Sequence, residues 1–135
     1  MQKPVQSFQE LRIYRLAFQN SIDLYALVEH LADDSATELA CRLLAISRAV
    51  RAHIAAAWGK RRDRLALLGQ LSEAHFQTTE IQIWLEVAIQ AGYLDADAGQ
   101  SLGDRYRYLA TALDQLMETV SIGRDRWDKD LPATA

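Results

Sequence analysis

The residues best suited to chemistry in this sequence are the cations of one segment, Arg42 to Arg64. Its basic residues are Arg42, Arg48, Arg51, Lys60, Arg61, Arg62 and Arg64, against the single acid Asp63. Guanidinium and ammonium groups at this density bind phosphate oxygens through charge-assisted hydrogen bonds. Trp58, beside the cluster, could stack on an unpaired base, although its place in an apolar stripe favours packing in the core. The segment therefore predicts a surface that meets nucleic acid or another acidic partner.

The segment stands out because the rest of the chain is acidic. It carries a net charge of +6, whereas the whole chain has a formal net charge of −3, so the remaining residues sum to −9. A concentrated positive field attracts phosphate or acidic protein even when the overall balance is negative. The strongly basic surface of a dedicated nucleic-acid binder is absent. Phosphate binding is therefore expected only where the cluster lines a local groove or pore.

Two other interpretations of these cations stay open. Arg42 lies on one flank of an apolar helical stripe and Arg48 and Arg51 on the other, where bundle helices place ion pairs between helices or subunits. Acids that could accept such pairs are Glu29, Asp33, Asp34, Glu73, Glu80, Glu86, Asp95, Asp97 and Asp104. The protein would then be a purely structural or protein–protein interaction scaffold with intersubunit ion pairs. In the other interpretation, the cations bind an acidic protein partner.

Enzymatic and metal chemistry has no comparable support. A di-iron bundle needs a Glu-x-x-His pair on each of two helices, and no Glu here has a His three residues later. His30, His53 and His75 show no metal-ligand spacing, and Glu73 and Glu80 are expected to be solvated or salt-bridged carboxylates. The sequence has neither a Gly-rich phosphate loop nor a nucleophile elbow. We expect no catalytic residues, no metal and no cofactor, and hence no enzyme.

Composition favours one all-helical domain. The chain has 135 residues, half of them apolar, and its two prolines, Pro4 and Pro132, lie near the ends. No obligatory helix breaker interrupts the residues between them. A chain of this length can bury a stable core without disulfide bonds or bound metal ions. The single cysteine, Cys41, suits a reducing compartment and is expected to be a buried, inert thiol. No apolar run approaches the roughly 20 residues of a membrane span, so we expect a soluble, cytoplasmic protein with no membrane partner.

Apolar periodicity predicts four helices, at about 8–31, 36–58, 64–91 and 96–121. Their expected core stripes are Leu11, Tyr14, Phe18, Ser21, Tyr25 and Val28; Leu39, Leu43, Ile46, Val50, Ile54 and Trp58; Leu67, Leu71, Ala74, Thr78, Ile81, Leu85 and Ala88; and Leu102, Tyr106, Leu109, Leu113, Leu116 and Val120. Ile83 and Trp84 widen the third stripe, which suggests more than one neighbour. Short links imply antiparallel helices. We predict an all-α, antiparallel up-down-up-down four-helix bundle over 1–123, followed by a flexible tail at 124–135.

Local signals mark the ends of these helices. The residues suited to begin a helix are Ser7, Ser35, Asp63 and either Asp95 or Asp97. Gly59 stands in the usual position of a left-handed cap at the end of the second helix, and Gly92 ends the third. The cations at 60–62 are therefore expected in a short, exposed connection between the second and third helices.

Short motifs over about Phe8 to Val120 are similar to those of a known family. They are Phe8, Leu11, Tyr14 and Ala17; Leu43, Val50, Ile54, Ala55 and Gly59 followed by Lys60 and Arg61; and Ala74, Glu80, Leu85, Ala88 and Gly92-Tyr93-Leu94. In these motifs the chain resembles the bacterial four-helix-bundle proteins encoded in intervening sequences of 23S ribosomal RNA genes, which are related to the accessory variability protein of diversity-generating retroelements. His53, Ala56 and Ala57 stand where that family usually has Asn, Glu and Gly, so any role of that Asn and Glu does not carry over.

The resemblance implies an assembly and a class of partner. It implies a homo-oligomer, a pentameric ring of bundles, that binds RNA or DNA or, as for the retroelement relatives, a reverse transcriptase. Together with the basic segment, this leads us to expect a non-enzymatic oligomeric accessory protein that meets its partner through residues 42–64. The exposed loop, Lys60 to Arg64, is the part expected to contact that partner, while Arg42, Arg48 and Arg51 are well placed to build the assembly.

Overall fold

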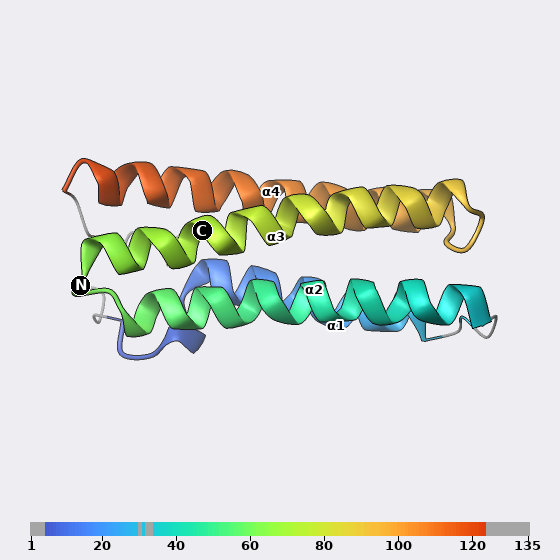
Figure 1. Cartoon of the computed structure of the whole chain (residues 1–135), viewed down its shortest axis with the longest axis horizontal. Helices are drawn as coiled ribbons and strands as arrows, with labels where there is room; N and C mark the ends of the chain where they lie inside the picture. Colours follow the sequence, from blue (N-terminus) through green and yellow to red (C-terminus); the bar gives the residue numbers. More distant parts are fainter. Residues whose placement is uncertain (1–4, 30, 32–33, 124–135) are drawn as a thin grey trace.

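The computed structural model describes residues 5–29, 31 and 34–123, and these form helices and turns without any strand. A short 3-10 helix, η1 (Phe8–Glu10), leads into α1 (Arg12–Val28), and three longer helices follow: α2 (Asp34–Gly59), α3 (Arg64–Gln90) and α4 (Ala96–Ser121). The helices lie side by side, and consecutive helices run in opposite directions (Figure 1). The predicted all-α architecture of four helices is confirmed.

Each helix packs against two neighbours around one core. The contacting pairs are α1–α2, α2–α3, α3–α4 and α4–α1. Residues 60–63, η1 and the last turn of α4 lie at one end of the bundle, which we call the loop end; the connection from α3 to α4, at 91–95, lies at the opposite end (Figure 1). Residues far apart in the sequence therefore meet at the loop end.

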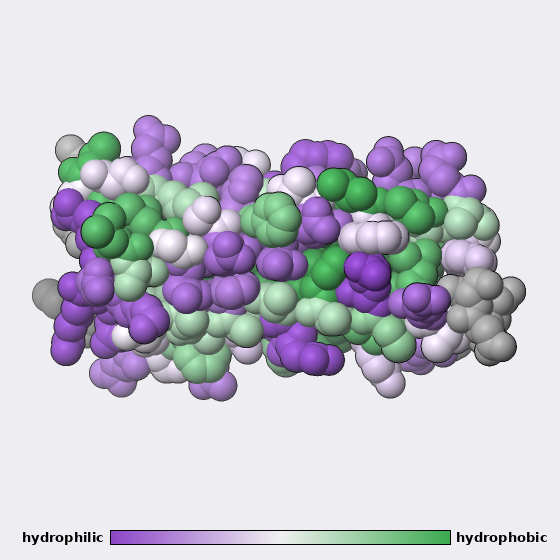
Figure 2. Space-filling view, viewed as in Figure 1, coloured by the Kyte–Doolittle hydropathy of each residue, from purple (hydrophilic) through white to green (hydrophobic). Residues whose placement is uncertain are grey.

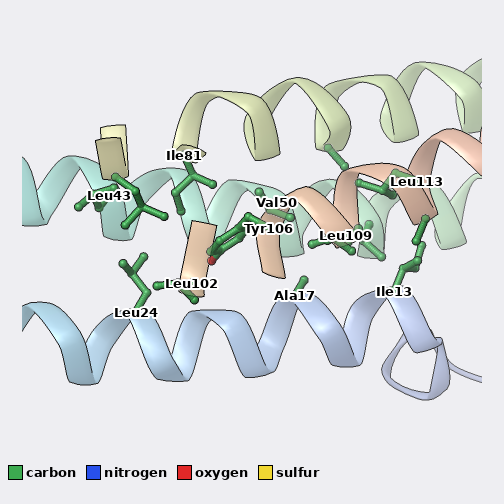
Figure 3. Packing of buried hydrophobic residues seen from close by; sticks show 14 of the residues in the cluster. Ile13, Ala17, Leu24, Leu43, Val50, Ile81, Leu102, Tyr106, Leu109 and Leu113 are labelled. Carbon is green, nitrogen blue, oxygen red and sulfur yellow. The ribbon is translucent and has the colours of Figure 1, made fainter. Parts of the chain in front are cut away.

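The inner faces of α3 and α4 are those that periodicity predicted. All seven predicted residues of α3, from Leu67 to Ala88, and all six of α4, from Leu102 to Val120, are buried. In α2, Leu43 and Val50 are fully buried, whereas Trp58 packs against the core while partly exposed. Figure 3 shows Leu43, Val50, Ile81 and Tyr106 pointing into the middle of the bundle. Burying each large apolar side chain contributes about 1.5–3 kcal/mol to folding.

The predicted core stripe of α1 is right at its ends, where Leu11 and Val28 are buried, and wrong between them. The buried residues of this helix are Ile13, Ala17, Asn20, Leu24 and Val28, whereas Phe18 and Tyr25 are 46% and 60% exposed. Most of the buried residues come one position before a predicted one, so α1 is turned by about 100° from the expected orientation. Large side chains of α4, Tyr106 among them, already fill the centre (Figure 3). Close packing there suits the small side chain of Ala17.

Capping residues begin the later helices as predicted. The Asp63 carboxylate accepts a hydrogen bond from the Ala66 amide at 3.2 Å, and the Asp95 carboxylate accepts one from the Ala98 amide at 3.0 Å. The Ser7 hydroxyl accepts from the Gln9 amide. It therefore caps the short η1, and α1 starts later than predicted. The side chain of Ser35 and the predicted tail at 124–135 lie outside the described residues.

Two predictions about individual residues of α2 are wrong. Gly59 is the last helical residue and is not left-handed, because the following Lys60 amide donates to the Ala56 and Ala57 carbonyls in a tight right-handed turn. The left-handed glycines of the described residues are Gly92 and Gly123, with φ of 81° and 84°. Cys41 is exposed rather than buried, because it lies two positions after the core residue Leu39, or about 200° around the helix.

Candidate functional site

The structure divides the seven predicted cations into three groups. Arg42 lies on α2 against α3, and Arg48 and Arg51 line a groove between α2 and α1. Lys60, Arg61, Arg62 and Arg64 lie at the loop end and form what we call the loop-end cluster. Arg42 is about 27 Å along α2 from the loop-end cluster, at 1.5 Å per residue. The segment is therefore three separate surfaces rather than one continuous basic strip.

Arg42 makes a structural contact between two helices. Its guanidinium carbon lies 4.7 Å from the centre of the Trp84 ring on α3. Such a cation–π contact contributes about 0.5–1 kcal/mol when exposed to solvent. None of Arg42, Arg48, Arg51, Lys60, Arg61 and Arg62 has an ion-pair partner among the described residues. Their charge is therefore not neutralised by a nearby carboxylate of the described chain.

The Arg61 side chain packs against the last turn of α2. Its guanidinium carbon lies 4.0 Å from the centre of the Trp58 ring, and its Nη1 donates to the Trp58 carbonyl at 2.9 Å. A cation at this position also complements the negative end of the helix dipole. Trp58 packs on the core, as predicted, and Arg61 lies against its ring. A stacking role of Trp58 toward a base would first require Arg61 to move.

A hollow of about 350 Å³ lies in the loop, lined by Gly59, Lys60, Arg61, Arg62 and Asp63. The side chains of Lys60 and Arg62 are exposed. The one acidic group in the hollow, the Asp63 carboxylate, is engaged in capping α3. The hollow also adjoins the N-terminal end of α3, which carries a partial positive charge. A concave surface lined by three cations favours an anionic group such as a phosphate.

The charges of the described residues are unevenly distributed along the bundle. In the half nearer the loop end, the cations are Arg12, Arg15, Arg48, Arg51, Lys60, Arg61, Arg62 and Arg64, and the acids are Glu10, Asp63, Glu73, Asp114 and Glu118. In the other half, the described side chains include the cations Arg42, Arg105 and Arg107 and the acids Asp23, Glu29, Glu38, Glu80, Glu86, Asp95, Asp97 and Asp104. The described side chains of the two halves carry +3 and −5. A polyanion is therefore attracted to the loop end and repelled from the other.

Arg48 and Arg51 belong to a second hollow, which we call the α1–α2 groove. It measures about 410 Å³ and is lined by Phe18, Ser21, Ile22, Tyr25, Leu44, Ser47, Arg48 and Arg51. The Arg51 guanidinium carbon lies 6.0 Å from the centre of the Phe18 ring, and Arg51 Nε is buried without a hydrogen-bond partner. Sequence reasoning missed this groove because it placed Phe18 and Tyr25 in the core.

A line of hydroxyl groups crosses the bundle beneath this groove. The Tyr106 and Ser47 hydroxyls are 3.0 Å apart, and Ser47 also bonds to the Ser21 hydroxyl. Burial raises the pKa of Tyr106 above its ordinary value of 10.0. Its phenol is therefore neutral near neutral pH, where it serves as a hydrogen-bonding group linking α4 to α2.

The histidines contact residues of neighbouring helices rather than one another. His53 Nδ1 lies 2.8 Å from Gln70 Oε1, and His75 Nε2 lies 3.4 Å from an Asp114 carboxylate oxygen; His30 lies outside the described residues. Across the described part of the chain, no three metal-ligating side chains gather into a cluster. No helix in that part is both long and apolar enough to cross a membrane.

Comparison with solved structures finds a relative in fold. The chain is similar to the crystal structure, at 1.70 Å, of a protein with unknown function from the S23 ribosomal protein family of Bacteroides thetaiotaomicron. The TM-score is 0.73 over 79% of this chain and 96% of that chain, with 17% sequence identity. The likeness is one of fold. No family model and no curated protein matches the chain.

Proposed function

We propose that this protein is a non-enzymatic, oligomeric accessory protein that binds nucleic acid through the loop-end cluster. The observation that carries the proposal is the hollow at 59–63, where Lys60, Arg61 and Arg62 surround a space of about 350 Å³ and the only acid is engaged as a helix cap. The surplus of cations in this half of the bundle supports it. The cluster would read the charge and shape of the phosphate backbone, because phosphate contacts carry no sequence information.

Assembly would multiply these contacts. The resemblance to the 23S rRNA intervening-sequence family implies a pentameric ring, and a ring related by rotation presents the same end of every subunit on one face. Five loop-end clusters on one face would engage a long RNA together, with an avidity that exceeds the affinity of one cluster by about 10²–10⁴. The negative charge of the other half then faces away from the RNA.

The test measures RNA binding against salt. For four phosphate contacts per chain on a duplex, affinity is expected to fall about 100-fold between 50 mM and 200 mM salt. Arg62→Glu should lower the affinity at least tenfold and reduce the salt slope by about one contact. Fluorescence anisotropy with a labelled RNA duplex measures both quantities.

The matched control is Arg107→Glu, which makes the same charge change in the acidic half. Arg107 is exposed, and among the described residues its ion-pair partner is the exposed Asp104, so its loss removes an interaction of little energy. This variant should bind RNA within about twofold of the parent, since it lies far from the cluster. Equal losses in the two variants, or no binding by the parent at 50 mM salt, would contradict the proposal.

A reverse transcriptase, the partner implied for the retroelement relatives, is a second candidate at the same cluster. The exposed Lys60 and Arg62 would then meet acidic side chains of that enzyme. Binding to a reverse transcriptase that survives nuclease treatment and is lost in Arg62→Glu, together with salt-insensitive or absent RNA binding, would favour this second candidate.

A further inference from the structure

Helix α3 carries apolar residues on two opposite sides. Its inner side forms the core, and on its outer side Phe76, Ile83 and Val87 are 55%, 48% and 41% exposed. At 100° per residue these three side chains lie within about 40° of one another, and we call them the outer α3 stripe. Figure 2 shows hydrophobic surface over α3 toward the α3–α4 connection. Apolar residues grouped on an exposed helix face mark a candidate contact surface, and no described residue covers this one in the single chain.

The outer α3 stripe is acidic as well as apolar. Between Leu65 and Gln90 the helix holds Glu73, Glu80 and Glu86 but no lysine or arginine. Glu80 lies between Phe76 and Ile83, turned only about 40–60° from them. An apolar stripe with carboxylates beside it would fit an apolar surface flanked by cations.

The α1–α2 groove has these complementary properties. Phe18, Ile22 and Tyr25 are all close to half exposed or more, at the i, i+4 and i+7 spacing of one helix face. Arg48 and Arg51 line the groove, and no acidic residue does. Arg51 Nε is buried without a hydrogen-bond partner. A buried unsatisfied donor is unfavourable, and a carboxylate entering the groove would satisfy it.

The groove and the stripe also overlap in part along the axis of the bundle. Arg42 on α2 contacts Trp84 on α3, and His53 on α2 contacts Gln70 on α3. These contacts set residues 44–51 of α2, which line the groove, beside about residues 73–80 of α3. This range includes Phe76 and Glu80, whereas Ile83 and Val87 lie about 5 and 10 Å farther along α3. Two copies can therefore lie side by side, with the Phe76 and Glu80 part of the stripe of one against the groove of the other.

We propose that the outer α3 stripe of one copy packs into the α1–α2 groove of a second copy, with Glu80 facing Arg48 and Arg51. This inference rests on the oligomeric assembly proposed above and names the two surfaces that build it. Because the two surfaces differ, the contact is heterologous, and a heterologous contact forms a ring where the rotation between copies closes, as the proposed ring requires. The loop-end cluster takes no part in the contact and stays open to another partner.

Two variants test the contact separately on each surface. The groove variant carries Phe18→Asp and Ile22→Asp, and the stripe variant carries Phe76→Asp and Ile83→Asp; all four residues are exposed, so the bundle should keep its helical circular dichroism. The parent is expected to have a mass that is a multiple of 15.2 kDa in sedimentation velocity. Each variant alone should be a monomer of 15.2 kDa. An equimolar mixture should form a one-to-one dimer, because only the intact groove of one chain and the intact stripe of the other can pair.

Specific outcomes overturn the inference. A parent that stays monomeric, or variants that keep the mass of the parent, would show that these surfaces do not join copies. Two monomeric variants that remain monomeric when mixed would show that an intact groove and an intact stripe do not pair. Variants that each form a dimer alone would mean that each surface pairs with itself. Binding of a different protein to the groove in a parent that is monomeric would identify another occupant.

A charge exchange gives an independent test that leaves the apolar residues intact. Arg48→Glu alone and Glu80→Arg alone should each lower the mass of the assembly, and the two changes in one chain should restore it. Failure to restore would contradict the proposed facing of Glu80 and Arg48. Arg62→Glu should leave the mass unchanged, and all masses are measured without RNA. Failure of nucleic-acid binding and failure of this contact are therefore distinguishable.

Discussion

At the scale of single residues, the chain places hydrogen-bonding groups inside an apolar core. Tyr106 is fully buried, and its hydroxyl reaches Ser47, which also bonds to Ser21. Because a buried polar group is unfavourable unless it is hydrogen-bonded, this line of hydroxyls is satisfied in only a few arrangements of α1, α2 and α4. It helps select one orientation of α1 among those that its apolar pattern allows.

The raised pKa of Tyr106 predicts a loss of stability at alkaline pH. Above about pH 10 the unfolded chain releases the phenol proton while the folded chain still holds it. The contribution of Tyr106 to stability is thus fully present below pH 10 and is lost as pH rises through the folded pKa. Urea unfolding at about pH 8 and about pH 11 should show a smaller loss for Tyr106→Phe than for the parent. An equal loss in both proteins would contradict this role.

At the scale of elements, close approach between helices depends on single glycines. A Cβ on Gly99 of α4 would lie 2.7 Å from Cδ1 and 2.8 Å from Cγ1 of Ile89 on α3, whereas a Cβ on Gly103 would meet nothing within 4 Å. The two glycines lie one turn apart on the same helix. Gly99 faces Ile89, whereas Gly103 faces open space. Alanine at Gly103 therefore reports helix propensity alone, and alanine at Gly99 reports propensity and packing together.

Alanine substitutions at these glycines are predicted to have unequal effects. Gly103→Ala should stabilise the protein by about 0.5–1 kcal/mol, because alanine favours the helix more than glycine does. Gly99→Ala gains the same propensity but must displace Ile89, and overpacking costs about 1–3 kcal/mol. Thermal or urea unfolding should therefore find Gly99→Ala less stable than Gly103→Ala. Equal stability would mean that Ile89 moves aside freely.

At the scale of the whole molecule, the basic surface and the proposed contact between copies lie on different parts of the bundle. The loop-end half is basic and the other half acidic, while the proposed contact between copies lies on the sides of the bundle. Assembly would then gather several loop-end clusters without covering them. Strong RNA binding is expected to depend on both surfaces, since each cluster alone makes few phosphate contacts.

A charge-neutral variant of the stripe tests this dependence. Phe76→Gln with Ile83→Gln should reduce the protein to a monomer and weaken binding to a long RNA at least tenfold, because multivalent binding is lost. Binding to an RNA hairpin that spans one cluster should not change, and this serves as the control. Undiminished binding of the monomeric variant to the long RNA would show that one cluster suffices.

The amino-acid sequence by itself determined the number of helices, their order and several of the residues at which they begin or end. The stripes from Leu67 to Ala88 and from Leu102 to Val120 and the cap at Asp63 were predicted, and Asp95 was one of the two caps predicted for α4. Periodicity and capping depend on neighbours within about one turn of helix, so they can be read from the chain. The loop position of Lys60 to Arg62 followed from the same local signals.

Only the tertiary structure decided which side of α1 faces the core and what surrounds Arg48 and Arg51. Two apolar stripes of α1 are offset by about 100°, and packing against Tyr106 and its neighbours selects Ile13, Ala17 and Leu24 while leaving Phe18 and Tyr25 outside. Burial depends on residues distant in sequence, so no local pattern shows which of the two stripes of α1 is buried. The same packing separated Arg48 and Arg51 from the loop-end cluster and placed them beside the exposed apolar residues of α1.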